Sequence, residues 1–139
     1  MASAAVAELF GVAQQLSDSG QGHHALALYR DFIACHPSNP LLHAVHFNHG
    51  VVLQQAGDSD GAASAFLEAI RLQPNFLPPH INLGSVYERL GAAEHALAHW
   101  NHALEVLAPV PGDALASAEG RDRDWVLSRV GRALGAQEA

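Results

Sequence analysis

Apolar and small residues recur at spacings of three and four along most of the chain, a pattern typical of amphipathic helices. Between positions 43 and 72 they form two runs: Val45, Val52 and Leu53, then Ala62, Phe66, Ala69 and Ile70. Gly57-Asp58 separates the runs, because glycine tolerates a positive φ and aspartate can cap a helix start. Pro74 follows the second run and cannot continue a helix. The pattern predicts two helices joined by a tight turn.

The same pattern occurs twice without a gap, in residues 43–76 and 77–110, two blocks of 34 residues. Gly50 and Gly84 are small where two helices approach closely, and Phe66 and Trp100 are large enough to fill the space beside them. A fixed period predicts stacked helix pairs, because one pair cannot bury its apolar face alone. Seven positions are identical: His46/His80, Asn48/Asn82, Gly50/Gly84, Val52/Val86, Gly57/Gly91, Ala62/Ala96 and Ala69/Ala103.

A more divergent copy precedes these blocks. Residues 3–18 and 23–35 have helical periodicity, and an offset of 37 residues aligns them with the next block. The three additional residues, Pro40 to Leu42, are expected to lengthen the following helix by a turn. The aligned pairs are Phe10/Phe47, Leu16/Leu53, Gly20/Gly57, Ala25/Ala62, Ile33/Ile70 and Pro37/Pro74.

Beyond the third copy, residues 108–118 contain proline and glycine and are expected to form a loop. Residues 119–136 are again helical in pattern, with apolar Trp125, Val126, Leu127, Val130 and Leu134. This helix either caps the last apolar face or is the first helix of a truncated fourth repeat.

The two blocks resemble the tetratricopeptide repeat (TPR) family. Its signature is W-x2-L-G-x2-Y, then A-x3-F, then P. The second block matches with Leu83-Gly84-x2-Tyr87 and Ala96-x3-Trp100, and the first with Gly50-x2-Leu53, Ala62-x3-Phe66 and Pro74; His46 and His80 replace the usual tryptophan. The resemblance implies an all-α fold, an α-α superhelix of three TPR helix pairs plus the C-terminal helix. We expect one domain over 1–139, with repeats at about 6–39, 43–76 and 77–110.

Composition narrows the function. The chain has 139 residues and a formal charge of −7, with seven arginines and no lysine, which argues against nucleic acid as a partner. No apolar run is long enough for a membrane span, and the N-terminal segment is a poor secretion signal. The single cysteine, Cys35, is expected to be a buried small hydrophobe in a reducing compartment. We therefore expect a cytoplasmic protein without membrane association; a bacterial origin is implied only by the resemblance to bacterial proteins described below.

In the TPR family the first helix of each repeat lines a concave groove. The resemblance implies a peptide-binding groove of ten residues, extended by Phe10, Gln14 and Asp18 on one side and by Arg129 and Arg132 on the other. Asn48 and Asn82 occupy the same place in two repeats and could hold a peptide backbone, or they could be ordinary packing or surface residues. The ten are Phe47, Asn48, Val51, Gln54, Gln55, Ile81, Asn82, Ser85, Glu88 and Arg89.

Some TPR proteins bind a C-terminal carboxylate through lysines and asparagines, and the absence of lysine argues against that clamp here.

Two groups of histidines are spaced to lie on adjacent helical turns: His43, His46 and His49, and His95, His99 and His102. Without acidic or cysteine partners at matching spacing, they are better read as packing or surface residues than as metal ligands. No cofactor, metal site or catalytic motif is predicted, and the chain is not expected to be an enzyme.

Three functions follow. The first is a protein-interaction scaffold that binds an extended peptide or partner helix in the groove. In the second, the chain recruits substrates for a glycosyltransferase, because residues 75–100, the proline-rich loop and residues 130–134 resemble bacterial relatives of the O-linked N-acetylglucosamine transferases, the SPINDLY-like proteins. The catalytic part of such an enzyme is absent from these residues. The third is an assembly factor that self-associates through the ends of its stack.

Overall fold

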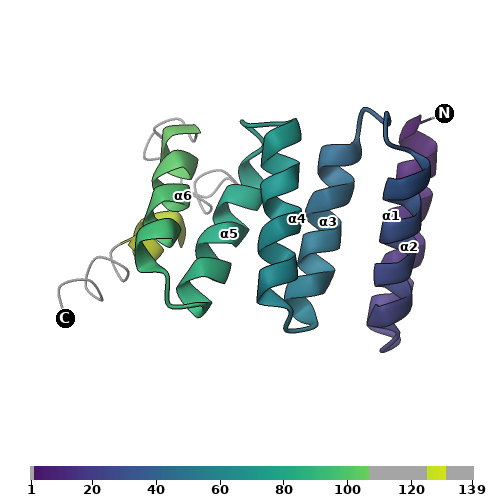
Figure 1. The fold of residues 1–139 in the computed structure, drawn as a ribbon, viewed down its shortest axis with the longest axis horizontal. Coiled ribbons are helices and arrows are strands. Elements are labelled where there is room, and N and C mark those ends of the chain that lie inside the picture. Colours follow the sequence, from purple (N-terminus) through teal and green to yellow (C-terminus); the bar gives the residue numbers. More distant parts are fainter. Residues whose placement is uncertain (1, 107–124, 131–139) are drawn as a thin grey trace, which may run out of the picture. The chain divides into compact units, whose positions relative to one another are not determined.

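The computed structural model describes residues 2–106 and 125–130, and the regular elements in these ranges are helices (Figure 1). This confirms the predicted all-α class built from consecutive helix pairs. The chain divides into two compact units, residues 1–76 (unit 1) and 77–139 (unit 2); the prediction of a single domain over 1–139 stays a prediction. The helices are α1 (Ala2–Asp18), α2 (Gly22–Cys35), α3 (Leu42–Gln55), α4 (Ser59–Leu72), α5 (Leu77–Arg89) and α6 (Ala93–Val106).

Unit 1 consists of two helical hairpins, α1–α2 and α3–α4, and α3 also packs against α2. Small residues let α1 and α2 approach closely. Ala13 of α1 and Ala25 of α2 are almost fully buried. Tyr29, which is only 3% exposed, completes this contact. The buried residues of this core are Val6, Leu9, Ala13, Ala25, Tyr29, Val45 and Val52.

The α3–α4 hairpin has the turn that its sequence predicts. Gly57 has φ +85°, which a residue with a side chain rarely adopts. Asp58 is the N-cap of α4, and its Oδ1 accepts a hydrogen bond from the Gly61 backbone N–H at 2.9 Å. Helix α4 ends at Leu72, two residues before Pro74.

Unit 2 contains the α5–α6 hairpin and a helical segment at residues 125–130. Trp100 and Val126 are fully buried in its core, and the Trp100 ring meets the Trp125 ring edge-on at 6.2 Å between centroids. Gly91 turns the chain between the helices with φ +78°. Of the C-terminal helix predicted at 119–136, the structure describes residues 125–130, which are helical. The rest of that helix and the loop predicted at 108–118 lie outside the described residues.

Two sequence-based expectations are wrong. Pro40 and Leu41 do not extend α3, which begins at Leu42, because the Asn39 Oδ1 accepts a hydrogen bond from the Leu41 N–H at 2.8 Å and holds a turn there. Cys35 is exposed rather than buried. It is the last residue of α2 and lies off the face that Ala25 and Tyr29 bury.

Candidate functional site

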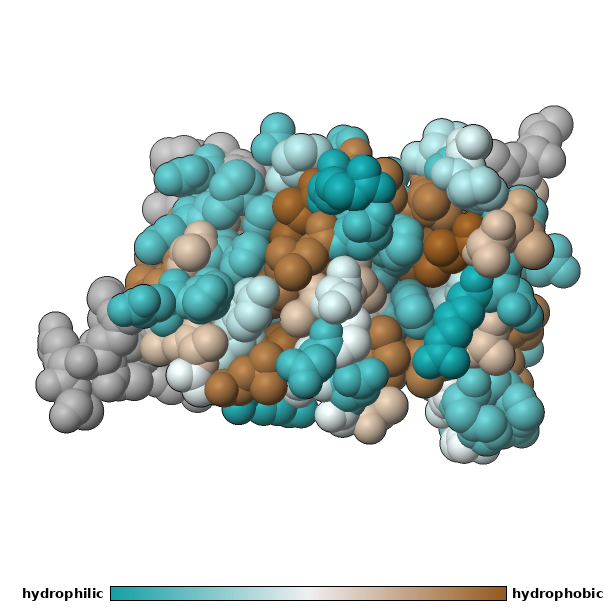
Figure 2. Space-filling model, viewed as in Figure 1, coloured by the Kyte–Doolittle hydropathy of each residue, from teal (hydrophilic) through white to brown (hydrophobic). Residues whose placement is uncertain are grey.

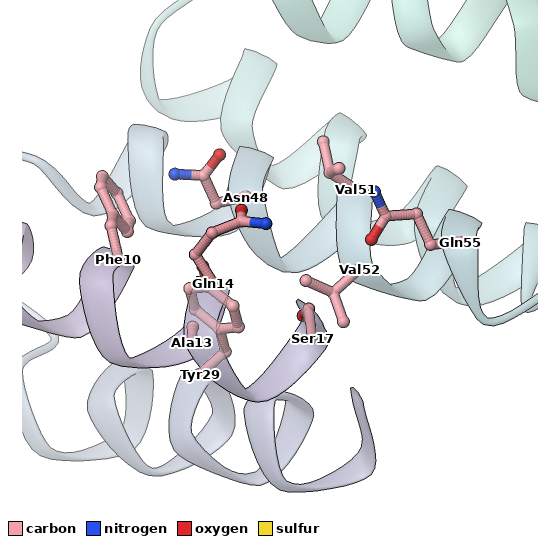
Figure 3. A pocket seen from close by; sticks show the side chains of 9 residues that line it. All are labelled: Phe10, Ala13, Gln14, Ser17, Tyr29, Asn48, Val51, Val52 and Gln55. Atoms are coloured by element: carbon pink, nitrogen blue, oxygen red, sulfur yellow. The ribbon is translucent and has the colours of Figure 1, made fainter. Parts of the chain in front are cut away.

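Unit 1 has a hollow between α1 and α3 with α2 at its base, which we call the α1–α3 hollow (Figure 3). Its volume is about 80 Å³. Pockets for small-molecule ligands are several times larger, so this hollow suits a side chain or a stretch of backbone better than a cofactor. It is lined by Phe10, Ala13, Gln14, Ser17, Tyr29, Asn48, Val51, Val52 and Gln55.

The lining combines an apolar floor with neutral polar groups, and none of its side chains is charged. Phe10 and Tyr29 lie 6.5 Å apart between ring centroids, and burial raises the pKa of Tyr29 to about 12. The Ser17 Oγ is buried and has no hydrogen-bond partner among the described residues. Gln14 donates its Nε2–H to the Asp18 carboxylate at 2.8 Å. The hollow therefore offers amide and hydroxyl groups beside aromatic and aliphatic surface.

Three of the five groove residues predicted in unit 1 line this hollow: Asn48, Val51 and Gln55. Phe47 and Gln54 do not line it. The Phe47 ring packs against Phe66 and Phe76, with centroids 5.6 and 5.8 Å away, so it belongs to the internal packing of the unit.

The predicted extension of the groove toward α1 includes two hollow-lining residues, Phe10 and Gln14. Ala13, Ser17, Tyr29 and Val52 also line the hollow and were not predicted. Ala13, Tyr29 and Val52 belong to the apolar core pattern, so nothing in the sequence marked them as accessible from a groove.

In unit 2 the five predicted residues of α5 have different environments. Ile81 packs against the core, and its carbonyl oxygen accepts the Trp100 Nε1–H at 3.2 Å. Asn82 and Ser85 are half-buried, and Arg89 is exposed. Glu88 lies 3.6 Å from Arg129, measured between Oε1 and Nη1. The groove assignment of all ten residues stays a prediction; Arg132 lies outside the described residues.

A second hollow of unit 1 lies on α2, α3 and α4, where His46 and His49 project from α3. Burial lowers the pKa of both imidazoles, that of His49 to about 4. In the described part of the chain, no three histidine, cysteine or acidic side chains are arranged to hold a metal ion. The hollow is lined by Arg30, Ile33, His46, His49, Leu53, Asp58, Gly61, Ser64, Ala65 and Glu68.

Among the residues that the structure describes, the large apolar side chains that reach the surface are scattered. Val12, Leu67, Leu90 and Leu127 are each 42–46% exposed and come from separate segments. Figure 2 shows polar and apolar residues interspersed on the face in view. None of the described helices is both long and apolar enough to cross a membrane.

No protein-family model matches the chain. Among curated proteins, the TPR repeat-containing thioredoxin TTL4 of Arabidopsis thaliana is 39% identical over 80 residues. The match includes 58% of this chain but spans only 11% of the length of that relative.

Solved structures with a similar fold are more distant in sequence. The type III secretion translocator chaperone SycD of Yersinia enterocolitica has a TM-score of 0.82 at 14% identity, over 100% of this chain and 90% of SycD. SycD in complex with a peptide of the translocator YopD has a TM-score of 0.65 at 14% identity, over 90% and 94%.

The first TPR of Spaghetti (RPAP3), bound to the HSP90 peptide SRMEEVD, has a TM-score of 0.73 at 15% identity. That similarity covers 94% of this chain and 91% of the Spaghetti chain. The solved structures show that this chain has a stacked helix-pair fold like theirs. The TPR-containing relative agrees with the resemblance of the sequence to tetratricopeptide repeats.

Proposed function

We propose that this tetratricopeptide repeat chain is a protein-interaction scaffold and that the α1–α3 hollow of unit 1 binds an extended peptide. The observation that carries the proposal is the lining of the hollow. Asn48 and Gln55 from α3 face it together with Gln14 from α1, so carboxamides on two helices meet beside the aromatic base (Figure 3). Carboxamides both donate to and accept from a peptide backbone, which suits a chain bound without strict reading of its sequence.

Two similar folds support a peptide as the partner, since SycD has been solved with a YopD peptide and the Spaghetti TPR with an HSP90 peptide. Because no side chain that lines the hollow is charged, we expect the bound part of the peptide to be uncharged as well. A carboxylate needs a cation or several donors in a desolvated site. No arginine lines the hollow and the chain has no lysine, so we propose that it takes an uncharged, internal stretch of a peptide.

The groove residues of unit 2 stay part of this proposal as predictions. Asn82 on α5 corresponds in sequence to Asn48 and is half-buried, so its amide is partly accessible. The similarities described above give no support to the glycosyltransferase alternative, and we do not propose it. Self-association and a bacterial cytoplasmic location remain untested expectations.

The test begins with a display library of linear peptides with blocked C-termini, selected against the full chain. The best binder is then measured by calorimetry against Asn48→Ala and Gln14→Ala variants. Each loses roughly one backbone hydrogen bond, so we expect a five- to tenfold weaker affinity with little change in melting temperature. Gln15→Ala is the matched control, because Gln15 is exposed next to Gln14 and does not line the hollow.

Two results would contradict the proposal. One is that selection yields no peptide that binds the folded chain. The other is that a selected peptide binds the Asn48, Gln14 and Gln15 variants equally well, which would place its site elsewhere on the chain.

A further inference from the structure

Four histidines gather around the α5–α6 hairpin of unit 2: His80 from α5 and His95, His99 and His102 from α6; we call them the four-histidine cluster. The rings of His80 and His102 stack with centroids 4.2 Å apart and planes inclined by 29°. The His80 and His99 rings lie 5.8 Å apart. The Tyr87 ring stacks on His99 at 5.5 Å and lies 5.3 Å from His95. Ring contacts therefore link α5 to α6 at several positions along this hairpin.

The centre of the cluster is shielded from water. His80 is only 4% exposed, and the His102 Nε2 is buried without a hydrogen-bond partner among the described residues. Burial lowers the pKa of His99, and the neighbouring His80, His102 and His95 lower it further. Packing in the folded hairpin thus favours the neutral form of this imidazole.

Five other charged groups of unit 2 lie in the described residues near this hairpin. Glu88 of α5 lies against Arg129 of the 125–130 segment. Glu94 and Glu105 of α6 and Arg89 of α5 are exposed to solvent. A proton added to His99 would therefore sit in a partly desolvated site beside three other imidazoles.

Unfolding removes this penalty. An imidazole in an unfolded chain accepts a proton at about pH 6.5. Below that pH the unfolded state of unit 2 binds more protons than the folded hairpin, so acid shifts the equilibrium toward opening. The effect of acid on the folding equilibrium grows with each imidazole that the packing keeps neutral.

We propose that the four-histidine cluster is an acid-sensitive switch that holds α5 and α6 together at neutral pH and lets unit 2 open under mild acid. It differs from the peptide-binding proposal in place and in chemistry. Its test needs no peptide, so either proposal can fail without the other.

Tryptophan fluorescence isolates unit 2, because both tryptophans of the chain, Trp100 and Trp125, belong to it. The full chain is titrated from pH 7.5 to 4 with EDTA present, and the emission maximum is followed together with far-ultraviolet circular dichroism. Trp100 is fully buried, so opening exposes it and moves the emission to longer wavelength. We expect a cooperative shift below about pH 6.5 that reverses on neutralisation.

A double variant, His99→Gln with His102→Gln, removes two rings of the cluster, among them the His99 imidazole whose pKa burial lowers. We expect its acid midpoint to fall by about 0.5 pH unit or more, because fewer protons drive opening. The matched control is His23→Gln with His24→Gln. Those two rings also lie close together, 4.1 Å apart, but both residues are exposed on α2 in unit 1. The control should leave the fluorescence midpoint unchanged.

An emission maximum that stays constant down to pH 4 would overturn the proposal. A midpoint that is the same in wild type and in a folded double variant would do so as well. If the double variant is unfolded at pH 7.5, the single variant His99→Gln replaces it, and its midpoint must also move to lower pH.

Discussion

The indole ring of Trp100 occupies the space that a Cβ atom on Gly84 would need. Its Nε1–H donates to the Ile81 carbonyl oxygen on the same helix as Gly84, at 3.2 Å. Phe66 stands in the same relation to Gly50 in unit 1, where an added Cβ would come within 2.6 Å of the ring Cε1. The α3–α4 and α5–α6 hairpins thus each bring a bare backbone against an aromatic ring, and the glycine is required by this close approach.

Gly84→Ala should strongly destabilise unit 2. Trp100 is fully buried and its ring is rigid, so it cannot move aside without disturbing the core. Overpacking of this kind costs about 1–3 kcal/mol of unfolding free energy. Urea unfolding followed by tryptophan fluorescence measures the loss.

Gly11→Ala is the control for that substitution. Gly11 is exposed in α1, and an added Cβ would meet nothing within 4 Å. Alanine there should stabilise the helix by about 0.5–1 kcal/mol, measured by circular dichroism because both tryptophans lie in unit 2. If Gly84→Ala were as well tolerated as Gly11→Ala, the close contact between Gly84 and Trp100 would be wrong.

This contact is also where sequence reasoning succeeded most fully. The period of 34 residues aligns Gly50 with Gly84 and Phe66 with Trp100, and a small residue paired with a large one predicts close helix packing. The turn at Gly57 was also predictable from the sequence, because a backbone with positive φ strongly favours glycine. Such features depend on backbone geometry, which each repeat must reproduce.

The site was less predictable, because it depends on which side chains reach the surface. Tyr29 reads as a core residue and is almost fully buried, yet it forms the base of the α1–α3 hollow. Arg129 was expected to extend the groove, but its guanidinium lies 4.8 Å from the centre of the Trp125 ring and beside Glu88. No periodic pattern encodes such pairings between side chains that are distant in sequence.

Asp58→Ala should weaken the start of α4. The Asp58 Oδ1 accepts the Gly61 N–H at 2.9 Å, and removing such a cap costs about 0.5–2 kcal/mol. Asp58→Asn keeps the acceptor oxygen and should remain close to wild type. Thermal unfolding by circular dichroism ranks the three proteins, and equal losses in the two variants would show that charge rather than capping matters.

Arg129→Ala should have only a small effect on stability. The Arg129–Glu88 pair is partly exposed, with 27% and 32% of the two side chains accessible, and such pairs contribute at most about 1 kcal/mol. The stacking of the guanidinium on Trp125 adds a similarly modest contribution. Arg129→Lys keeps the charge but loses the planar contact, so it should fall between wild type and alanine in urea unfolding.

A loss above about 2 kcal/mol in Arg129→Ala would contradict this weak contribution. Because Trp125 reports directly on the neighbouring group, its fluorescence should also change in the alanine variant at neutral pH. An unchanged spectrum would mean that the guanidinium does not stack on the ring in solution.

His49 should make the stability of unit 1 fall in mild acid. Its ring lies 5.7 Å from Tyr29, and its Nε2 is buried without a hydrogen-bond partner in the described part of the chain. Burial first, and then the nearby Arg30 and His46, lower its pKa to about 4. The unfolded imidazole titrates near pH 6.5, so between about pH 6.5 and 4 the unfolded state holds the additional proton. The stabilising contribution is complete above pH 6.5 and is lost as the pH falls toward 4.

The imidazole Hε1 resonance of His49, followed by NMR from pH 7.5 to the onset of unfolding, gives the pKa directly. We expect it to stay in the neutral position through pH 6, where an exposed imidazole is already largely protonated. His49→Gln should reduce the slope of unit 1 stability against pH, measured by hydrogen exchange of α3 amides. His24→Gln is the control, because His24 is exposed on α2. A resonance that titrates at pH 6.5 or above would mean that water reaches the His49 ring, which would remove the acid sensitivity assigned to it.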